Sequence, residues 1–169
     1  SADASSPLTL LWANGYRKPR YLWYLKETRD ARHRAGLDRT APLGLVYSPS
    51  DAELASSPTS PDLPPSALYG NMGWAMLRSS WDKDATLLAV KSGFTWNHAH
   101  ADAGSFMLFH DGEYLLIDSG NCTYGRPEYD AYYRQDRAHN VVLFNGAAEN
   151  LEDTYFGSKF PGTVSHLMD

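Results

Sequence analysis

The sequence predicts a mainly β fold, an antiparallel β-sandwich preceded by a short α-helical segment. After residue 66 the chain consists of short runs in which apolar and polar residues alternate, as in half-buried strands. The first 40 residues instead show the spacing of amphipathic helices, and prolines crowd the stretch between the two parts. We therefore expect a helical segment over residues 1–40, a linker or long loop over residues 41–66 and an incomplete β-sandwich over residues 67–169.

Two helices are expected in the N-terminal segment. Pro7 suits the first turn of one helix and Gly15 its end, because proline fits the start of a helix and glycine its C-terminus. The second helix is expected over Tyr21–Arg34, with Leu22 and Leu25 on its apolar side. Two helices do not make an independent domain, so this segment is expected to end a larger helical part.

Turn residues stand at both ends of each expected strand. The strands are Trp74–Arg78, Thr86–Lys91, Ser105–His110, Glu113–Asp118 and Asn140–Phe144. Asp111 and Gly112 form a type I′ pair between two of them and predict a hairpin with a two-residue loop. Its register would place Phe109 opposite Tyr114, Met107 opposite Leu116 and Ser105 opposite Asp118.

The charge of the chain argues against two classes of partner. With 15 Lys and Arg against 20 Asp and Glu, the chain is mildly acidic and offers no electrostatic footprint for nucleic acid or an anionic membrane. No apolar run is long enough to predict a membrane span. Cys122 is the single cysteine, so no disulfide can close within the chain.

Ionisable side chains gather near residue 100. His98, His100 and Asp102 alternate, so extended backbone places them on one face, where they are costly unless they bind metal, catalyse or face solvent. Asp118 ends one expected strand and His139 precedes another. With His100 they supply two imidazoles and one carboxylate, a set that suits zinc and leaves a fourth position for water or substrate. The spacing alone leaves metal binding, catalysis and a solvent face open.

Three motifs make a family resemblance specific: HAHADAGSF at residues 98–106, LIDSG at residues 116–120 and AHNVV at residues 138–142. Together they resemble the signature of the heparinase II/III family of polysaccharide lyases. The resemblance implies the C-terminal β-sandwich of such an enzyme, part of a larger supersandwich, after the last helices of an α/α toroid. It also implies β-elimination on an acidic, uronic-acid-containing polysaccharide, a periplasmic or secreted location, and the toroid and further strands as the remaining parts of the lyase.

The resemblance also assigns roles to individual residues. It implies that His100, Asp118 and His139 bind a structural Zn²⁺ and that His98 is the active-site histidine. Asp102 is expected to orient one of the histidines through a ring N–H.

The segment from residue 121 to 137 is rich in tyrosine and arginine. Pro127 is expected to open a short helix with Tyr129, Tyr132 and Tyr133 on one side. Tyr124 is our choice for a catalytic tyrosine, and Arg134, Tyr132 and Tyr133 are expected to contact substrate. The arginines of the segment can equally form ion pairs with its acidic residues; the residues concerned are Arg126, Arg134, Arg137, Glu128, Asp130 and Asp136.

The hairpin register sets a geometric condition. It places Asp118 on the face of Ser105, whereas an unbroken strand would put His100 on the opposite face. We therefore expect the chain to bulge or turn near Ala103 and Gly104.

Two other functions remain open on the sequence. One is a non-catalytic carbohydrate-binding sandwich, in which Trp74, Trp81 and Trp96 stack on sugar and the histidines brace the fold. The other is a cupin-like metal enzyme, because two histidines and one acid on a β fold also suit iron.

Overall fold

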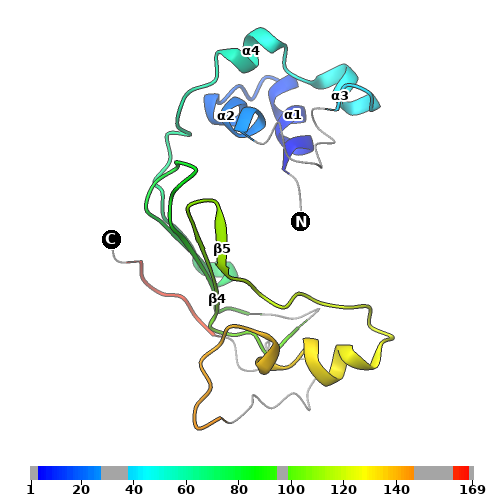
Figure 1. Ribbon diagram of the computed structural model, residues 1–169. Helices are drawn as coiled ribbons and strands as arrows, with labels where there is room; N and C mark the ends of the chain where they lie inside the picture. The colour runs from blue at the N-terminus through cyan, green and yellow to red at the C-terminus, as the bar shows by residue number, and fades with distance from the viewer. Residues whose placement is uncertain (1–3, 28–37, 95–98, 147–161, 168–169) are drawn as a thin grey trace. The chain divides into compact units, whose positions relative to one another are not determined.

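The computed structural model describes residues 4–27, 38–94, 99–146 and 162–167 (Figure 1). The chain divides into two compact units, Ser1–Leu63 and Pro64–Asp169. The first described unit is helical and the second is built on a β-sheet. The predicted class, mainly β and antiparallel after a helical segment, is confirmed.

Four helices make up the described part of the first unit: α1 (Ser5–Ala13), α2 (Pro19–Glu27), α3 (Pro42–Tyr47) and α4 (Asp51–Ala55). Helix α1 packs against α2 and α3, and α4 packs against α2 (Figure 1). The core consists of Trp12, Leu22, Leu25 and Leu54. Leu22 and Leu25 thus form the buried side predicted for the second helix, whose expected continuation beyond Glu27 falls outside the described residues.

The stretch expected as a linker or long loop is partly helical. Pro42 lies in the first turn of α3, where its missing N–H removes no hydrogen bond. Ser50 caps α4. The prolines therefore separate short helices in this stretch and do not keep all of it extended.

The cap of α4 also joins it to α1 and to the turn that follows α1. Ser50 Oγ accepts from the Glu53 N–H, and the Glu53 carboxylate accepts from the Ser50 N–H at 2.8 Å. The same carboxylate accepts from Trp12 Nε1 at 3.2 Å and from Arg17 at 2.8 Å. These bonds hold the charged form, so the pKa of Glu53 lies below its ordinary value of 4.5, chiefly because of the hydrogen bond from the Ser50 backbone.

This lowered pKa predicts an acid-dependent loss of stability. The stabilisation from Glu53 is complete above about pH 4.5, the value expected in the unfolded chain, and is lost as the pH falls through the lowered native pKa. We expect Glu53→Gln to lower the free energy of unfolding by about 1 kcal/mol at pH 7 and by much less at pH 3. Urea titrations at the two pH values measure this; an equal difference at both would contradict it.

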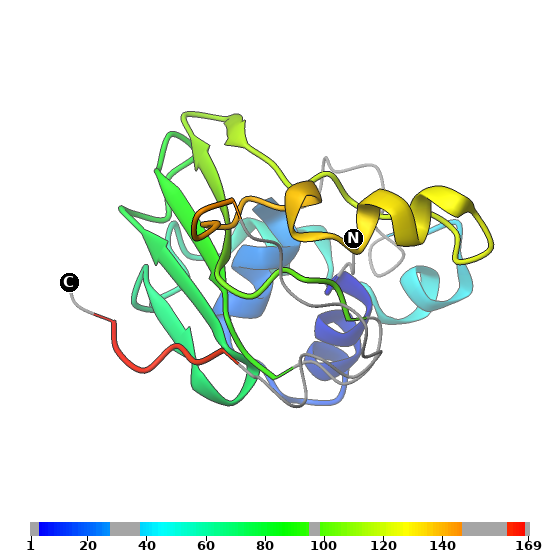
Figure 2. The same ribbon diagram turned by 90° about the horizontal axis from the view of Figure 1, so that it is seen from below.

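The second unit contains a five-stranded antiparallel meander in its described part. In order across the sheet, the strands are β1 (Ala67–Tyr69), β2 (Trp74–Arg78), β3 (Leu87–Lys91), β4 (Ser105–His110) and β5 (Glu113–Leu116) (Figure 2). Helical turns η1 (Gly70–Met72), η2 (Tyr129–Tyr133, a π-helix) and η3 (Asp136–Ala138) complete the described elements. The strand expected over Asn140–Phe144 is wrong: only a single bridge forms there, at Phe144.

The hairpin of β4 and β5 confirms one predicted pair and overturns the next. Phe109 pairs with Tyr114 as predicted, but Leu116 pairs with Leu108 and not with Met107, because the ladder shifts between Leu108 and Phe109. One extra residue of β5 at this point makes a β-bulge, which exchanges the faces of the residues that follow. Strand β5 ends at Leu116, so the predicted Ser105–Asp118 pair does not form.

One face of the sheet carries the site. Trp74 pairs with Lys91, and Lys91 pairs with Ser105, so these three form a row across β2, β3 and β4. Cross-strand partners lie on the same face of a sheet. The row therefore presents an indole, an ammonium and a hydroxyl side by side at one end of the sheet.

Candidate functional site

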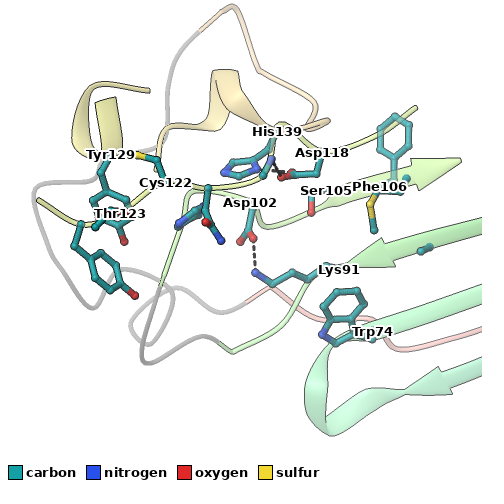
Figure 3. A pocket seen from close by; sticks show the side chains of 16 residues that line it. Trp74, Lys91, Asp102, Ser105, Phe106, Asp118, Cys122, Thr123, Tyr129 and His139 are labelled. Atoms are coloured by element: carbon teal, nitrogen blue, oxygen red, sulfur yellow. Dashed lines mark hydrogen bonds and ion pairs between the residues drawn. The ribbon is translucent and has the colours of Figure 1, made fainter. Parts of the chain in front are cut away.

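A cavity of about 670 Å³ lies over this row (Figure 3). One wall is the sheet, with Trp74, Lys91 and Ser105. The facing wall comes from the chain after β5: Asp118, residues 120–124, Tyr129 of η2 and His139. Segments distant in the sequence thus close one cavity in the described part of the second unit.

The turn that carries His100 is fixed from two sides. The Gly104 N–H donates to the Lys91 carbonyl at 2.8 Å, and the Ala101 N–H donates to the Arg134 carbonyl at 2.9 Å. Gly104 has a φ of +81°, which favours glycine. The turn expected near Ala103 and Gly104 is therefore present, and it directs His100 into the cavity.

His139 and Asp118 contact each other directly. His139 Nδ1 and Asp118 Oδ2 are 2.6 Å apart, and the His139 side chain is only 2% exposed. The second carboxylate oxygen of Asp118 accepts from the Gly120 N–H at 2.7 Å. Asp118 is thereby held in one orientation and fixes the imidazole of His139.

Two neighbours of this pair hold its backbone. The Asn140 amide donates to the Phe106 carbonyl at 3.0 Å and to the Ile117 carbonyl at 3.2 Å. The Ser119 hydroxyl donates to the Ala138 carbonyl. The chain on either side of His139 is thus bound to the start of β4 and to the segment after β5.

This arrangement determines the tautomer of His139. An ionised carboxylate only accepts hydrogen bonds, so Nδ1 carries the proton and, in the neutral ring, Nε2 carries the lone pair. Nε2 is buried and has no hydrogen-bond partner among the described residues. A buried acceptor without a partner is costly, and a cation would satisfy it.

His100 lies beside His139. The centroids of the two rings are 5.2 Å apart, and the His100 ring meets the Tyr129 ring edge-on at 5.8 Å. Burial lowers the pKa of His100, and His139 lowers it further. A lowered pKa keeps the imidazole neutral at neutral pH, the form that ligates metals.

The three predicted ligands are therefore neighbours, though they do not converge on one point. Within the described residues, no three His, Cys, Asp or Glu side chains are placed to hold a metal ion together. Asp118 is directed at the ring of His139, as carboxylates beside metal-binding histidines often are. Zinc binding remains a prediction.

Asp102 has a different partner from the one expected. Its carboxylate forms an ion pair with Lys91, and both side chains are largely buried. Among the described residues no hydrogen bond joins Asp102 to His100, and His98, the other histidine that Asp102 was expected to orient, lies outside them, so this prediction is untested. The sequence offered a signal for Lys91, a charged residue ending an apolar strand, but its role depends on the pairing of β3 with β4.

The predicted tyrosines occupy different surroundings. Tyr124 lines the cavity, is 57% exposed and meets the Tyr129 ring edge-on at 4.7 Å. Tyr129 is buried in the cavity wall. Tyr132 approaches Ser119 at 3.4 Å, and Tyr133 lines a second hollow. The three residues Tyr129, Tyr132 and Tyr133 therefore do not all face the cavity.

Arg134 and His98 are the remaining residues with a predicted role at the site. Arg134 pairs with Asp130 at 2.9 Å and lies over the Tyr129 ring at 5.8 Å, so its guanidinium serves local contacts. Its assignment to substrate is untested. His98 and Trp96 lie outside the described residues, and the role of His98 stays a prediction.

In the described ranges no helix is long and apolar enough to cross a membrane.

The fold is shared with a polysaccharide lyase of known structure. The crystal structure of heparan sulfate lyase from Pedobacter heparinus matches 85% of this chain and 20% of that chain with a TM-score of 0.54. The sequence identity is 22%, so this likeness establishes the fold alone.

Sequence comparison identifies the family. The family described as heparinase II/III-like, C-terminal, matches residues 61–159, which is more than half of the chain. The chain belongs to this family, as its three motifs predicted. A heparin-sulfate lyase from Bacteroides stercoris is 36% identical over 88 residues, and one from Pedobacter heparinus is 34% identical over 85 residues. These matches cover 48% and 47% of this chain but only 13% of each lyase.

Proposed function

We propose that the intact protein carrying this chain is a polysaccharide lyase that cleaves uronic-acid-containing polymers by β-elimination. The observation that supports this most is that His100, Asp118 and His139, one from each of the three motifs, line the same cavity. The relatives named as heparin-sulfate lyases support an acidic polysaccharide as substrate. The toroid would supply the remaining catalytic groups, and a periplasmic or secreted location suits such a substrate.

Two features of the site support a bound Zn²⁺ ion. His139 presents a buried Nε2 without a partner among the described residues, and burial keeps the neighbouring His100 neutral. Lys91 pairs with Asp102, and the Asp118 carboxylate contacts the imidazole of His139. His139 would hold the ion through Nε2 and His100 through its imidazole, and the ion would act as a structural crosslink between the two cavity walls. Asp118, the third expected ligand, is bound to Nδ1 on the other side of the His139 ring and would have to leave that contact to join them.

The residues of the chain would then serve the elimination in distinct ways. The C5 proton of a uronate becomes acidic once its carboxylate is neutralised, and a base then removes it while an acid protonates the leaving oxygen. His98 would neutralise the carboxylate or transfer the proton, and fixing His100 two residues away would direct it. Tyr124, on the cavity rim, would exchange a proton with substrate.

The test is a panel of uronic-acid polymers, including heparan sulfate, hyaluronan and alginate, offered to the intact protein. We expect ultraviolet absorbance from an unsaturated uronate product with at least one polymer and one zinc per chain by elemental analysis. Binding without product would favour the non-catalytic carbohydrate-binding alternative, for which Trp74 offers a stacking surface. Iron in place of zinc would favour the cupin-like enzyme.

A further inference from the structure

A second hollow adjoins the cavity. It has a volume of about 380 Å³ and is lined by Cys122, Thr123, Arg126, Glu128 and Tyr133. Cys122 and Thr123, which Figure 3 shows at the first cavity, line both hollows, so the two hollows are neighbours. A linear ligand in the cavity that extends past Cys122 and Thr123 would reach the second hollow.

The structure distinguishes among the three arginines of this segment. Arg134 is 18% exposed and pairs with Asp130, and Arg137 donates to the Ala131 carbonyl. Both guanidinium groups hold η2 and the chain beside it. Arg126 is 65% exposed and lines the second hollow, which makes it the arginine best placed to meet a ligand there.

The partner of Arg126 is easily displaced. Arg126 Nε lies 3.4 Å from Glu128 Oε2, and the Glu128 side chain is also largely exposed. An exposed ion pair at this distance contributes little. A planar guanidinium binds a carboxylate or a sulfate through two parallel hydrogen bonds, which is a stronger contact.

We propose that the second hollow is a subsite for the sugar next to the one in the cavity, and that Arg126 binds an acidic group on that sugar. The acidic group is a carboxylate or a sulfate, and the Tyr133 ring offers the sugar an aromatic surface. In this segment, Arg126 is then the residue that recognises substrate, and not Arg134 as expected from the sequence. The inference rests on the proposed function, because the ligand in the cavity is taken to be an acidic polysaccharide.

The experiment compares Arg126→Gln with Glu128→Gln in the intact protein. Isothermal titration calorimetry measures the Kd of a heparan-sulfate tetrasaccharide, of its unsulfated counterpart and of the corresponding disaccharide. We expect Arg126→Gln to raise the Kd of the tetrasaccharide about tenfold, the loss of one charge-assisted contact, and to leave the disaccharide unchanged. Glu128→Gln is expected to leave the Kd unchanged or to lower it, because it removes the competing carboxylate.

The two tetrasaccharides identify the acidic group, since an effect confined to the sulfated one assigns a sulfate and an effect on both assigns a carboxylate. Equal weakening by Arg126→Gln and Glu128→Gln would mean that the ion pair only stabilises the loop, and would overturn the proposal. An unchanged Kd in Arg126→Gln, or wild-type protein that binds no oligosaccharide, would overturn it as well.

The lyase assay separates this inference from the proposed function. Binding that depends on Arg126 without any unsaturated product supports the subsite and defeats the lyase. If Arg126→Gln keeps both its turnover and its Kd, the result supports the lyase and contradicts the proposed subsite. Arg126→Lys serves as a second variant, because a point charge cannot make the two parallel bonds and is expected to restore only part of the affinity.

Discussion

Replacing His139 by alanine is expected to remove the zinc ion from the intact protein and to lower kcat by at least about 100-fold. The side chain is 2% exposed, its Nδ1 is bound to Asp118, and its Nε2 has no other partner in the described part of the chain. Alanine would delete the lone pair offered to the metal and leave the Asp118 carboxylate without the imidazole N–H. Elemental analysis and initial rates on the same preparation measure both effects.

Two further variants make this result specific. His98→Ala is expected to lose turnover while keeping its zinc, because the resemblance gives His98 a role at the substrate and none at the metal. Tyr114→Phe is the control: Tyr114 of β5 is 65% exposed and does not line the cavity, so both zinc and rate should be retained. A His139→Ala protein with one zinc per chain would remove His139 from the ligand set.

The second large effect is expected at a glycine. Gly73→Ala should lower the free energy of unfolding by about 3 kcal/mol, the combined cost of a left-handed backbone and of overpacking. Gly73 has a φ of +64°, and an added Cβ would lie 2.2 Å from the Gly93 Cα and 2.3 Å from the Ser92 carbonyl oxygen. These are backbone atoms, so β2 and β3 would have to separate where Trp74 pairs with Lys91.

A neighbouring glycine supplies the control for this variant. Gly70 does not have a positive φ, and nothing lies within 4 Å of the Cβ that alanine would add there. Gly70→Ala should therefore change stability by less than about 0.5 kcal/mol. Urea titrations of the two variants beside the wild type measure the contrast. Similar stabilities for Gly73→Ala and Gly70→Ala would show that β2 and β3 are not closely packed at Gly73.

Local sequence patterns predicted some features of the sheet and missed others. Short apolar runs bounded by turn residues predicted β2 and β4 at their observed bounds. The pair Asp111-Gly112 predicted the turn, and Asp111 has the positive φ that a type I′ turn requires. The bulge at the other end of the hairpin was missed, because an extra residue leaves the apolar run Tyr114–Ile117 looking like regular strand.

Some features of the site could likewise be predicted from the sequence and others could not. His100, Asp118 and His139 could be selected from residue type, motif and order along the chain, and the structure places them in one cavity. The contact of Asp118 with His139 Nδ1, the pairing of Asp102 with Lys91 and the second hollow at Arg126 could not be selected so. Each depends on which side chain from another segment arrives beside it.

The sequence by itself determined the class of fold, the family and the residues proposed to bind metal, because these follow from periodicity and from residue types at short spacing. Only the tertiary structure decided the hairpin register, the partner of each carboxylate and the walls of the two hollows. The physical reason is that a hydrogen bond or ion pair acts over a few ångströms. Whether Asp118 meets His139 depends on Asn140 binding to the sheet and on Ser119 binding to Ala138, contacts that exist only in the folded chain.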